Sequence, residues 1–345
     1  MSGLDATALR DWLSCHFPED DGPDAKLAFE PISGGQSNPT YFVNWGARRL
    51  VLRRKPTGPI LPGAHAIERE FRVLRALDGT DVPVPRALVF EEDAEVLGTP
   101  FYVMERLEGR VFSDCALPGL SPEERRAMYL SMAETLARLH AVRPEEVGLS
   151  DYGRPSGYFE RQLRRWSAQY AESSGPRIAA LNQLMAWLPA NMPSDDGAVS
   201  ISHGDFRLGN MMFHPTEPRV IAVLDWELCT LGHPLADLGF CVMPWQTAPD
   251  EYGGILGLDQ AAIGIPSREE FVAHYHAHAR PTRELTLFHR AFALFRFAVI
   301  FVGIADRARA GSAASDEAAE LGPLAERFAI RALQAAGLDE PGHGS

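Results

Sequence analysis

Cysteine is scarce in this chain. Four cysteines occur among 345 residues, and no two of them have the CxxC spacing of a metal-binding knuckle. Small disulfide-stabilised domains and zinc modules need closely spaced cysteines. The sequence therefore argues against both classes and indicates free thiols in a reducing compartment.

Long apolar runs are scarce as well. Residues 1–17 carry acidic and polar side chains at short intervals, without the apolar segment of a secretory signal. The most apolar segment, residues 291–305, is interrupted by Arg296 and is shorter than the ~20 residues that a membrane span needs. We therefore expect a cytoplasmic protein with no membrane partner, in which this segment forms a buried helix.

Basic side chains are outnumbered by acidic ones. The chain has 33 Lys and Arg against 46 Asp and Glu, a formal charge of −13 at pH 7. Such a balance repels the backbone of nucleic acids, so a nucleic-acid partner is disfavoured. A nucleotide site needs only a local positive patch and remains compatible with this charge.

The residue pattern changes near Leu107. Before it, period-two alternation and turn residues predict five strands and two helices: strands at 27–32, 40–45, 49–53, 84–91 and 100–105, helices at 4–17 and 65–77. After it, long helices are predicted at 122–140, 157–170, 177–188, 268–278 and 282–310. We expect an α+β fold with two lobes, a five-stranded antiparallel sheet with its helix in residues 1–107 and a mostly helical lobe in residues 108–345.

The most informative stretch is HGDFRLGN, residues 203–210. Asp205 precedes Asn210 by five residues, and Asp225 follows at the end of the apolar run 220–224. This order matches the catalytic loop and metal-binding Asp of kinases. Asp205 would accept the proton of a hydroxyl nucleophile, while Asn210 and Asp225 would offer hard oxygen ligands to Mg²⁺ beside a nucleotide. Either motif alone also occurs by chance, but the two in order predict a phosphoryl-transfer centre.

A glycine-rich turn precedes the second predicted strand. Gly34 and Gly35 would let backbone N–H groups approach phosphate oxygens, and Ser37 and Asn38 would add donors. A Gly-Gly turn is also an ordinary hairpin connection. The turn alone therefore does not identify a nucleotide site.

Two charged residues have the spacing of a phosphate-binding cation and its partner. Arg53 ends the third predicted strand, and Glu70 follows seventeen residues later in the helix. Arg keeps its charge and can bind phosphate with two nitrogen atoms. Arg54 or Lys55 could serve instead, and solvated surface charges are the simpler alternative.

The fifth predicted strand, FYVME, leads into the lobe junction. The Glu105 carbonyl and the Leu107 N–H, beneath Met104, would suit the flat ring of adenine. Met104 could equally be ordinary core packing.

These motifs together resemble a known family. The ordered segments SGGQSNPTY, LVLRRKP, IEREFRVL, YVMERLEG, ISHGDFRLGN, AVLDWE and HPLADLGF resemble those of the aminoglycoside phosphotransferase family, which has the bilobal protein-kinase-like fold. More narrowly, IEREFRVL, GYFERQLRRWSAQY and LDWELCTLGHPLADLGF are similar to the kinase-like domain associated with certain acyl-CoA dehydrogenases.

The resemblance implies ATP- and Mg²⁺-dependent phosphorylation of a small-molecule hydroxyl. For the narrower branch it implies hydroxyacyl-CoA acceptors such as 4-hydroxyacyl-CoA, and a functional link to an acyl-CoA dehydrogenase. Carried over, Asp205 is the base, Asn210 and Asp225 are the Mg²⁺ ligands, and Arg53 with Glu70 binds phosphate. Arg53 is a departure, because relatives with antibiotic activity have Lys there.

Other acceptors and roles stay open. Arg161, Arg164 and Arg165 on one predicted helix could bind the phosphates of a CoA-like tail or form a solvated basic face. An aminoglycoside, another small alcohol or a non-catalytic nucleotide-binding role are the alternatives. The Pro234 turn begins only nine positions after Asp225, which leaves no room for the peptide platform of protein kinases.

Two further features have structural interpretations. Asp237 begins a predicted helix, and we expect its carboxylate to accept backbone N–H groups around His203. His274, His276 and His278 predict an exposed helix face, because no Cys or carboxylate completes a metal-ligand set at helical spacing.

Overall fold

The computed structural model describes residues 3–18, 25–32, 38–56, 66–309 and 322–338. The chain divides into two compact units, residues 1–110 with 221–229 and residues 111–220 with 230–345. The predicted division was at residue 107. The first unit differs from the predicted lobe mainly in including residues 221–229. The Val223 N–H of this segment donates to the Pro83 carbonyl at 2.8 Å.

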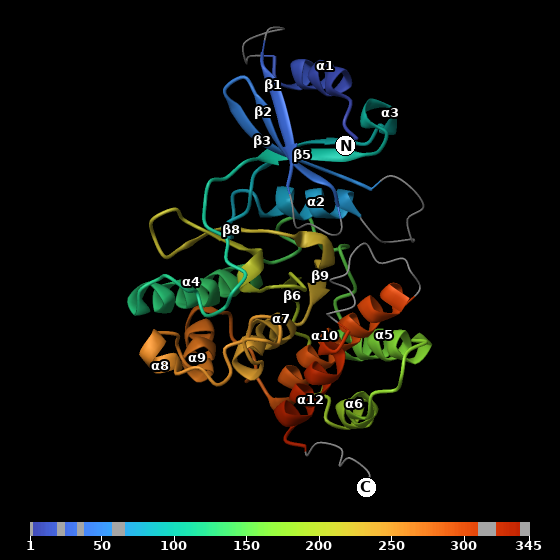
Figure 1. The fold of residues 1–345 in the computed structure, drawn as a ribbon, viewed down its shortest axis with the longest axis vertical. Coiled ribbons are helices and arrows are strands. Elements are labelled where there is room, and N and C mark those ends of the chain that lie inside the picture. Colours follow the sequence, from blue (N-terminus) through green and yellow to red (C-terminus); the bar gives the residue numbers. More distant parts are fainter. Residues whose placement is uncertain (1–2, 19–24, 33–37, 57–65, 310–321, 339–345) are drawn as a thin grey trace. The chain divides into compact units, whose positions relative to one another are not determined.

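The first unit is built on a five-stranded sheet with the order β1-β2-β3-β5-β4, and every neighbouring pair is antiparallel (Figure 1). The strands are β1 (Leu27–Pro31), β2 (Thr40–Trp45), β3 (Arg48–Arg54), β4 (Ala87–Glu91) and β5 (Phe101–Glu105). Strand β4 begins three residues after its predicted start at Val84, because Pro83 and Pro85 have no N–H to donate to a ladder.

Alternation along the strands determines which side chains meet the helices. Phe101 and Val103 of β5 belong to an apolar cluster with Trp12 of α1 (Ala6–His16), and the Trp12 and Phe101 rings lie 4.9 Å apart. Tyr102 points to the opposite face, where its ring lies 5.9 Å from Phe71 of α2 (Ile67–Leu77). Because successive side chains of a strand point to opposite faces of the sheet, Tyr102 lies against α2. A one-turn helix, α3 (Ala94–Leu97), precedes β5.

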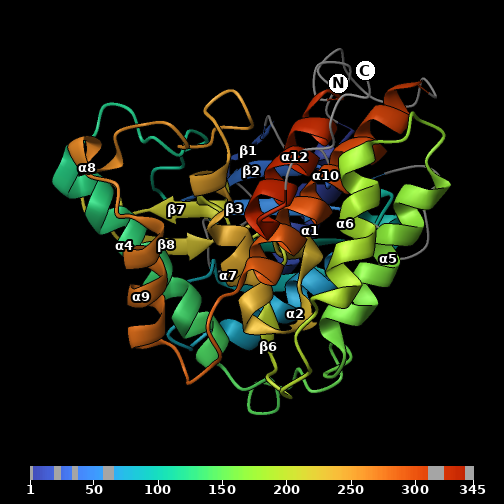
Figure 2. The same ribbon diagram turned by 90° about the horizontal axis from the view of Figure 1, so that it is seen from below.

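The second unit is mainly helical. Its helices are α4 (Pro122–Ala141), α5 (Tyr158–Glu172), α6 (Ala179–Ala190), α7 (Pro234–Cys241), α8 (Gln260–Ile263), α9 (Arg268–His278), α10 (Leu287–Arg309) and α12 (Leu324–Ala336). Short strands β6 (Ser200–Ser202), β7 (Met211–Phe213) and β9 (Thr230–Gly232) carry the connecting loops of this unit, and all of β8 (Val220–Val223) except Val220 belongs to the first unit. Figure 2 shows α10 beside α12 and α4 beside α9, and both pairs are in contact. The α+β prediction is confirmed.

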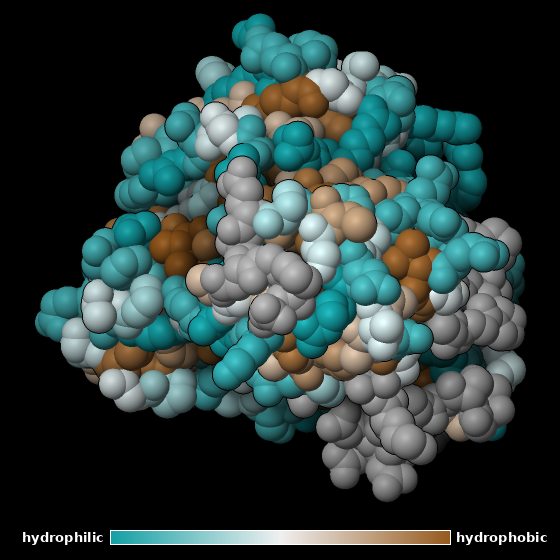
Figure 3. Space-filling view, turned by 90° about the horizontal axis from the view of Figure 1, so that it is seen from above, coloured by the Kyte–Doolittle hydropathy of each residue, from teal (hydrophilic) through white to brown (hydrophobic). Residues whose placement is uncertain are grey.

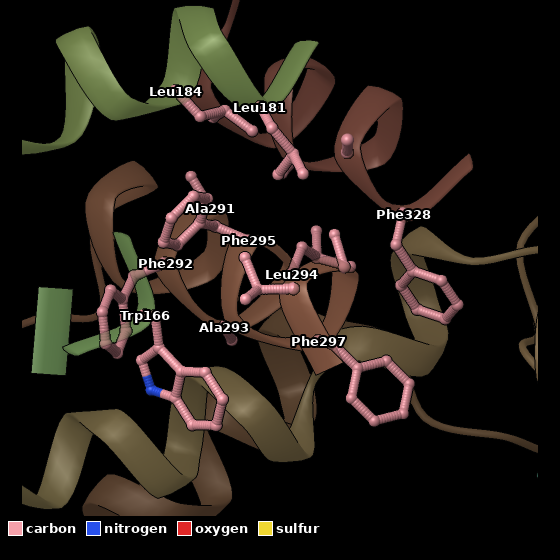
Figure 4. Packing of buried hydrophobic residues seen from close by; sticks show 14 of the residues in the cluster. Trp166, Leu181, Leu184, Ala291, Phe292, Ala293, Leu294, Phe295, Phe297 and Phe328 are labelled. Carbon is pink, nitrogen blue, oxygen red and sulfur yellow. The ribbon is translucent and has the colours of Figure 1, made fainter. Parts of the chain in front are cut away.

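Helix α10 contributes many of the side chains of a large apolar cluster in this unit. Figure 4 shows Phe292, Leu294 and Phe297 of α10 among Trp166 of α5 and Phe328 of α12. The Phe297 and Phe328 rings are 4.8 Å apart.

The length argument against a membrane span was wrong, because α10 has 23 residues and is long and apolar enough to cross a bilayer. Burial decides the matter instead: 72% of its most apolar window lies inside the protein. Helix α10 is therefore the buried core helix that the sequence predicts.

Hydrophilic residues predominate on the face that Figure 3 shows, with separate hydrophobic patches between them. The large apolar residues that are exposed within the described ranges are Val111, Leu228, Tyr252, Leu256 and Leu287. Single exposed apolar residues are normal on protein surfaces.

Candidate functional site

The predicted base, Asp205, lies in the loop between β6 and the short 3-10 turn Leu208–Asn210. Its Oδ2 atom accepts a hydrogen bond from Asn210 Nδ2 at 2.7 Å and another from Arg207 Nε at 3.2 Å. Both contacts use the same carboxylate oxygen. Oδ1 is consequently the oxygen that can accept a proton from a hydroxyl group.

Asn210 is buried, and its orientation follows from its contacts. The amide Nδ2 donates to the Asp205 carboxylate and also, at 2.9 Å, to the Asp205 carbonyl. Because the nitrogen end is directed at Asp205, the carbonyl oxygen Oδ1 is the end available to a cation. A hard oxygen donor of this kind fits Mg²⁺.

Asp237 of α7 holds the beginning of the loop. Its carboxylate accepts the backbone N–H groups of His203 at 2.7 Å and Gly204 at 2.9 Å, and the Ser202 hydroxyl at 3.0 Å. The contacts predicted for Asp237 are therefore present. Burial by itself raises the pKa of Asp237, but the hydrogen bond and charge of His140 and the Gly204 N–H lower it below its usual value.

Sequence reasoning missed a second support of the loop. Arg296, buried in α10, donates from Nη2 to the Gly204 carbonyl at 2.6 Å. Its guanidinium also lies over the Trp166 and Phe240 rings, at 5.4 and 5.5 Å. In the sequence, Arg296 appeared only as the residue that interrupts an apolar segment. A charged residue within an apolar segment that is expected to be buried needs a partner, and this signal could have identified Arg296 as a support of the loop.

Gly204 is held at a positive φ of 83°, where a side chain would be strained. This conformation lets two consecutive N–H groups, of His203 and Gly204, point at one carboxylate. Asp237 and Arg296 thus fix both the donors and the acceptor of the peptide units before Asp205.

In the first unit, the predicted phosphate cation and one metal ligand form a charged cluster. Arg53 Nε lies 2.8 Å from Glu70 Oε2, and Arg53 Nη2 donates to Asp225 Oδ1 at 3.0 Å. Glu227, which sequence reasoning did not assign, is 3.9 Å from the same Nη2. The structure brings Arg53, Glu70 and Asp225 together, as the kinase pattern predicts.

Glu70 is buried, and its surroundings change its protonation. Burial, together with the nearby Asp225 and Glu227, raises the pKa of Glu70 to about 7 against the lowering effect of Arg53. Tyr102 donates its hydroxyl to Glu70 Oε2 at 3.2 Å. Although burial lowers the pKa of Arg53, Glu70 and the other neighbouring acidic groups raise it above its usual value, so this guanidinium stays charged.

Asn38 has a different contact from the predicted one. Sequence analysis assigned it as an extra phosphate donor, but its amide Nδ2 donates to Glu70 Oε1 at 2.7 Å. Asn38 is therefore placed to hold Glu70 in position beside Arg53. The other turn residues assigned to phosphate, Gly34, Gly35 and Ser37, lie outside the described residues.

The predicted adenine-binding segment spans the end of β5 and the residues that follow it. Met104 is half-buried in the strand, and the Glu105 N–H donates to the Arg86 carbonyl at 3.0 Å. The Glu105 side chain is also engaged, because it accepts the Arg86 N–H at 2.9 Å. These contacts fix the strand end that leads to Leu107, and the roles of Met104, Glu105 and Leu107 toward adenine stay predictions.

A cavity of about 610 Å³ opens in the second unit. Phe159, Asp196, His233, Arg283 and His289 are among the residues that line it. Among its described lining residues, Asp205 is absent. The cavity is thus not the place where a hydroxyl group would meet that carboxylate.

The comparisons with known proteins agree with this geometry. The model of the phosphotransferase enzyme family, APH, matches residues 28–285. The chain belongs to this family. A relative from Gallus gallus, acyl-CoA dehydrogenase family member 11, is 41% identical over 323 residues, which make up 92% of this chain and 41% of the relative. This phosphotransferase thus spans about two fifths of that relative's length.

Solved structures support the same assignment. A candidate aminoglycoside phosphotransferase from Ralstonia eutropha JMP134 is 44% identical, with a TM-score of 0.86 over 97% of this chain and 98% of that chain. The GDP complex of aminoglycoside 2'-phosphotransferase-IIIa is 16% identical, with a TM-score of 0.63 over 94% of this chain and 99% of that one, and shows the shared fold. The resemblance seen in the sequence is confirmed, and the chain is a small-molecule phosphotransferase with the kinase-like fold.

Proposed function

We propose that this phosphotransferase transfers the γ-phosphoryl group of ATP to a hydroxyl group of a hydroxyacyl-CoA thioester. The observation that carries the chemistry is the Asp205 carboxylate held by Asn210 at 2.7 Å, with Oδ1 left to act on a substrate. A base oriented by fixed donors is what proton transfer from a hydroxyl group requires.

The proposed step balances without further reactants. The acceptor oxygen attacks the γ-phosphorus, and its proton passes to Asp205 Oδ1. The bond between the γ-phosphorus and the bridging oxygen breaks, and ADP leaves with the electron pair. Arg53, held by Glu70, is proposed to bind the α and β phosphates, where its fixed charge lowers the energy of the developing anion.

Asn210 Oδ1 and the Asp225 carboxylate are the proposed ligands of Mg²⁺. Asn210 fits because its amide nitrogen is already committed to Asp205, and Asp225 fits as a partly exposed carboxylate after β8. When bound, the ion neutralises phosphate charge. Adenine is proposed to bind at Met104, the Glu105 carbonyl and the Leu107 N–H.

The acyl-CoA part of the proposal has two supports. The first is the name of the relative from Gallus gallus, acyl-CoA dehydrogenase family member 11. The second is the basic face of α5, where Arg164 and Arg165 are exposed. Arg164 pairs with Glu160 at 2.7 Å, but an exposed pair of this kind is weak and can yield to a phosphate. A functional link to an acyl-CoA dehydrogenase is part of this proposal.

The experiment is ADP release with ATP and Mg²⁺ against 4-hydroxyacyl-CoA thioesters, the free hydroxy acids, aminoglycosides and choline. We expect turnover of the thioesters that Asp205→Asn reduces by about 10²–10⁴-fold while ATP binding persists, since Asp205 acts on the acceptor. Turnover of aminoglycosides alone would show that the acceptor is an aminoglycoside and not a hydroxyacyl-CoA thioester. Unchanged turnover in Asp205→Asn would overturn the assignment of the base.

A second variant tests the acyl-CoA contact. Arg164→Ala is expected to raise the KM for the thioester and leave the KM for the free hydroxy acid unchanged. Arg219→Ala is the matched control, because Arg219 is also exposed and also paired with a Glu. Equal effects of the two variants would remove the basic face of α5 from the proposal. ATP binding without turnover of any acceptor would favour a non-catalytic nucleotide-binding protein.

A further inference from the structure

The packing of α4 against α9 brings together three side chains of the types that bind metals. Glu134 comes from α4, and His274 and His278 come from α9. One ligand atom from each residue lies within 4.8 Å of the others. The sequence analysis considered carboxylates at helical spacing only, whereas Glu134 lies 140 residues before His274 in the chain.

The distances suit one ion. His274 Nε2 lies 2.9 Å from Glu134 Oε1, and the His274 and His278 rings have their centroids 4.5 Å apart. Two ligands at 2.0–2.1 Å from a tetrahedral zinc ion are ~3.3 Å apart, so small side-chain rotations would bring all three into place. Histidines at positions i and i+4 of a helix share one face, which presents both imidazoles to the same ion.

A hydrogen bond determines which nitrogen of His278 is available. His278 Nδ1 lies 2.8 Å from the His274 carbonyl oxygen, which can only accept. Nδ1 therefore carries the hydrogen, and Nε2 of the neutral ring keeps its lone pair. Metal-binding histidines characteristically donate their other nitrogen to a carbonyl or carboxylate in this way.

Glu134 keeps one oxygen for the ion. Its Oε2 lies 3.4 Å from Arg138 Nη2, whereas Oε1 faces His274. The Arg138 pair is partly exposed and weak. Since Glu134 and His274 are half-buried and His278 is exposed, an ion can reach the cluster and a water molecule can complete its coordination.

We propose that Glu134, His274 and His278 form a binding site for a divalent transition-metal ion of the Zn²⁺ type. Two imidazoles and one carboxylate favour such an ion over Mg²⁺, which prefers oxygen ligands. The site is distinct in chemistry from the proposed Mg²⁺ ligands Asn210 and Asp225.

The ion would join two helices that support the loop carrying Asp205. The Tyr275 hydroxyl of α9 lies 2.7 Å from His140 Nδ1 of α4, and His140 Nε2 lies 3.4 Å from Asp237 Oδ2. Because α4 and α9 carry both the Glu134, His274 and His278 cluster and the Tyr275–His140 contact, metal binding is expected to stabilise this part of the second unit.

The test is titration of the full, chelator-treated protein with Zn²⁺ in millimolar Mg²⁺, which occupies oxygen-only sites. We expect one equivalent to bind and to raise the Tm, and Co²⁺ to give the visible absorption of a low-coordinate nitrogen and oxygen site. His278→Ala and Glu134→Gln should weaken Zn²⁺ binding at least tenfold, as loss of even outer-shell contacts costs 10–100-fold.

His276→Ala is the matched control, because His276 lies on the same helix but outside the cluster. It should bind Zn²⁺ like the unchanged protein. Equal weakening by His276→Ala and His278→Ala, or no binding at 100-fold excess of Zn²⁺ over protein, would overturn the proposal. Several equivalents that all three variants retain would show adventitious binding only.

Discussion

Replacement of Asp237 by Asn tests how the loop that carries Asp205 is held. In the native protein, Oδ1 accepts from the Gly204 N–H and the Ser202 hydroxyl, and Oδ2 accepts from the His203 N–H and His140. Asn retains one oxygen and directs an NH₂ group at two donors. Hydrogen bonds to a charged group contribute about 1.5–3 kcal/mol each, so loss of two should cost about 3–6 kcal/mol of unfolding free energy.

This contribution has a defined pH range. The folded pKa of Asp237 is lowered, so its stabilisation is fully present above the unfolded pKa of about 3.9 and is lost as the pH falls through the folded pKa. At pH 7 the whole effect of Asp237→Asn should therefore be visible. It should also lower kcat, because the His203 and Gly204 peptide units lead directly into Asp205.

The assay combines urea unfolding at pH 7 with measurement of kcat and of nucleotide binding. Ser202→Ala is the control, since it removes only one hydrogen bond to the carboxylate and should cost about 1.5–3 kcal/mol, roughly half as much. The first unit does not contain Asp237, so the proposed nucleotide contact of Arg53, which Glu70 holds, should persist in both variants. A change below about 0.5 kcal/mol in Asp237→Asn, with kcat unaltered, would refute the supporting role because surface substitutions behave that way.

Three further predictions concern other parts of the molecule. Because the pKa of Glu70 is about 7, the folded state keeps a proton that the unfolded chain loses near pH 4.5. The unfolding free energy should fall as pH rises between these values, and Glu70→Gln should flatten that slope in urea titrations from pH 5 to pH 8. Arg296→Met removes the charged donor to the Gly204 carbonyl, so we expect a lower kcat with unchanged nucleotide Kd; an unaltered kcat would contradict the assigned contact. Phe297→Ala removes the ring contact with Phe328 and should lower the unfolding free energy by about 3–5 kcal/mol in urea unfolding. A decrease below about 1 kcal/mol would show that this core is not packed as described.

Local patterns accounted for most of the elements. The prediction of a helix at 268–278 coincides with α9, whose start has the Ser267 and Glu270 capping box. Strand alternation likewise identified β2 at residues 40–45. These signals are local, since capping and periodicity involve neighbours within one or two turns, and they need no knowledge of the rest of the chain.

The order of Asp205, Asn210 and Asp225 was also sufficient to indicate phosphoryl transfer, because kinase chemistry requires those residue types at that spacing. The contact of Arg296 that supports the loop could not be predicted from the sequence in this way. Arg296 reaches the Gly204 carbonyl from 92 residues away, and no spacing in the sequence connects them. Only the packing of α10 in the core decides that its charge meets a loop carbonyl.

The sequence by itself thus determined the fold class and the family, and it predicted the residue types of the reaction. The tertiary structure alone decided that Asn38 binds Glu70, that a 23-residue apolar helix is buried, and that Glu134 meets His274 and His278. The physical reason is that side-chain partners are set by long-range packing of whole elements, whereas helices, strands and contiguous motifs arise from interactions between near neighbours in the chain.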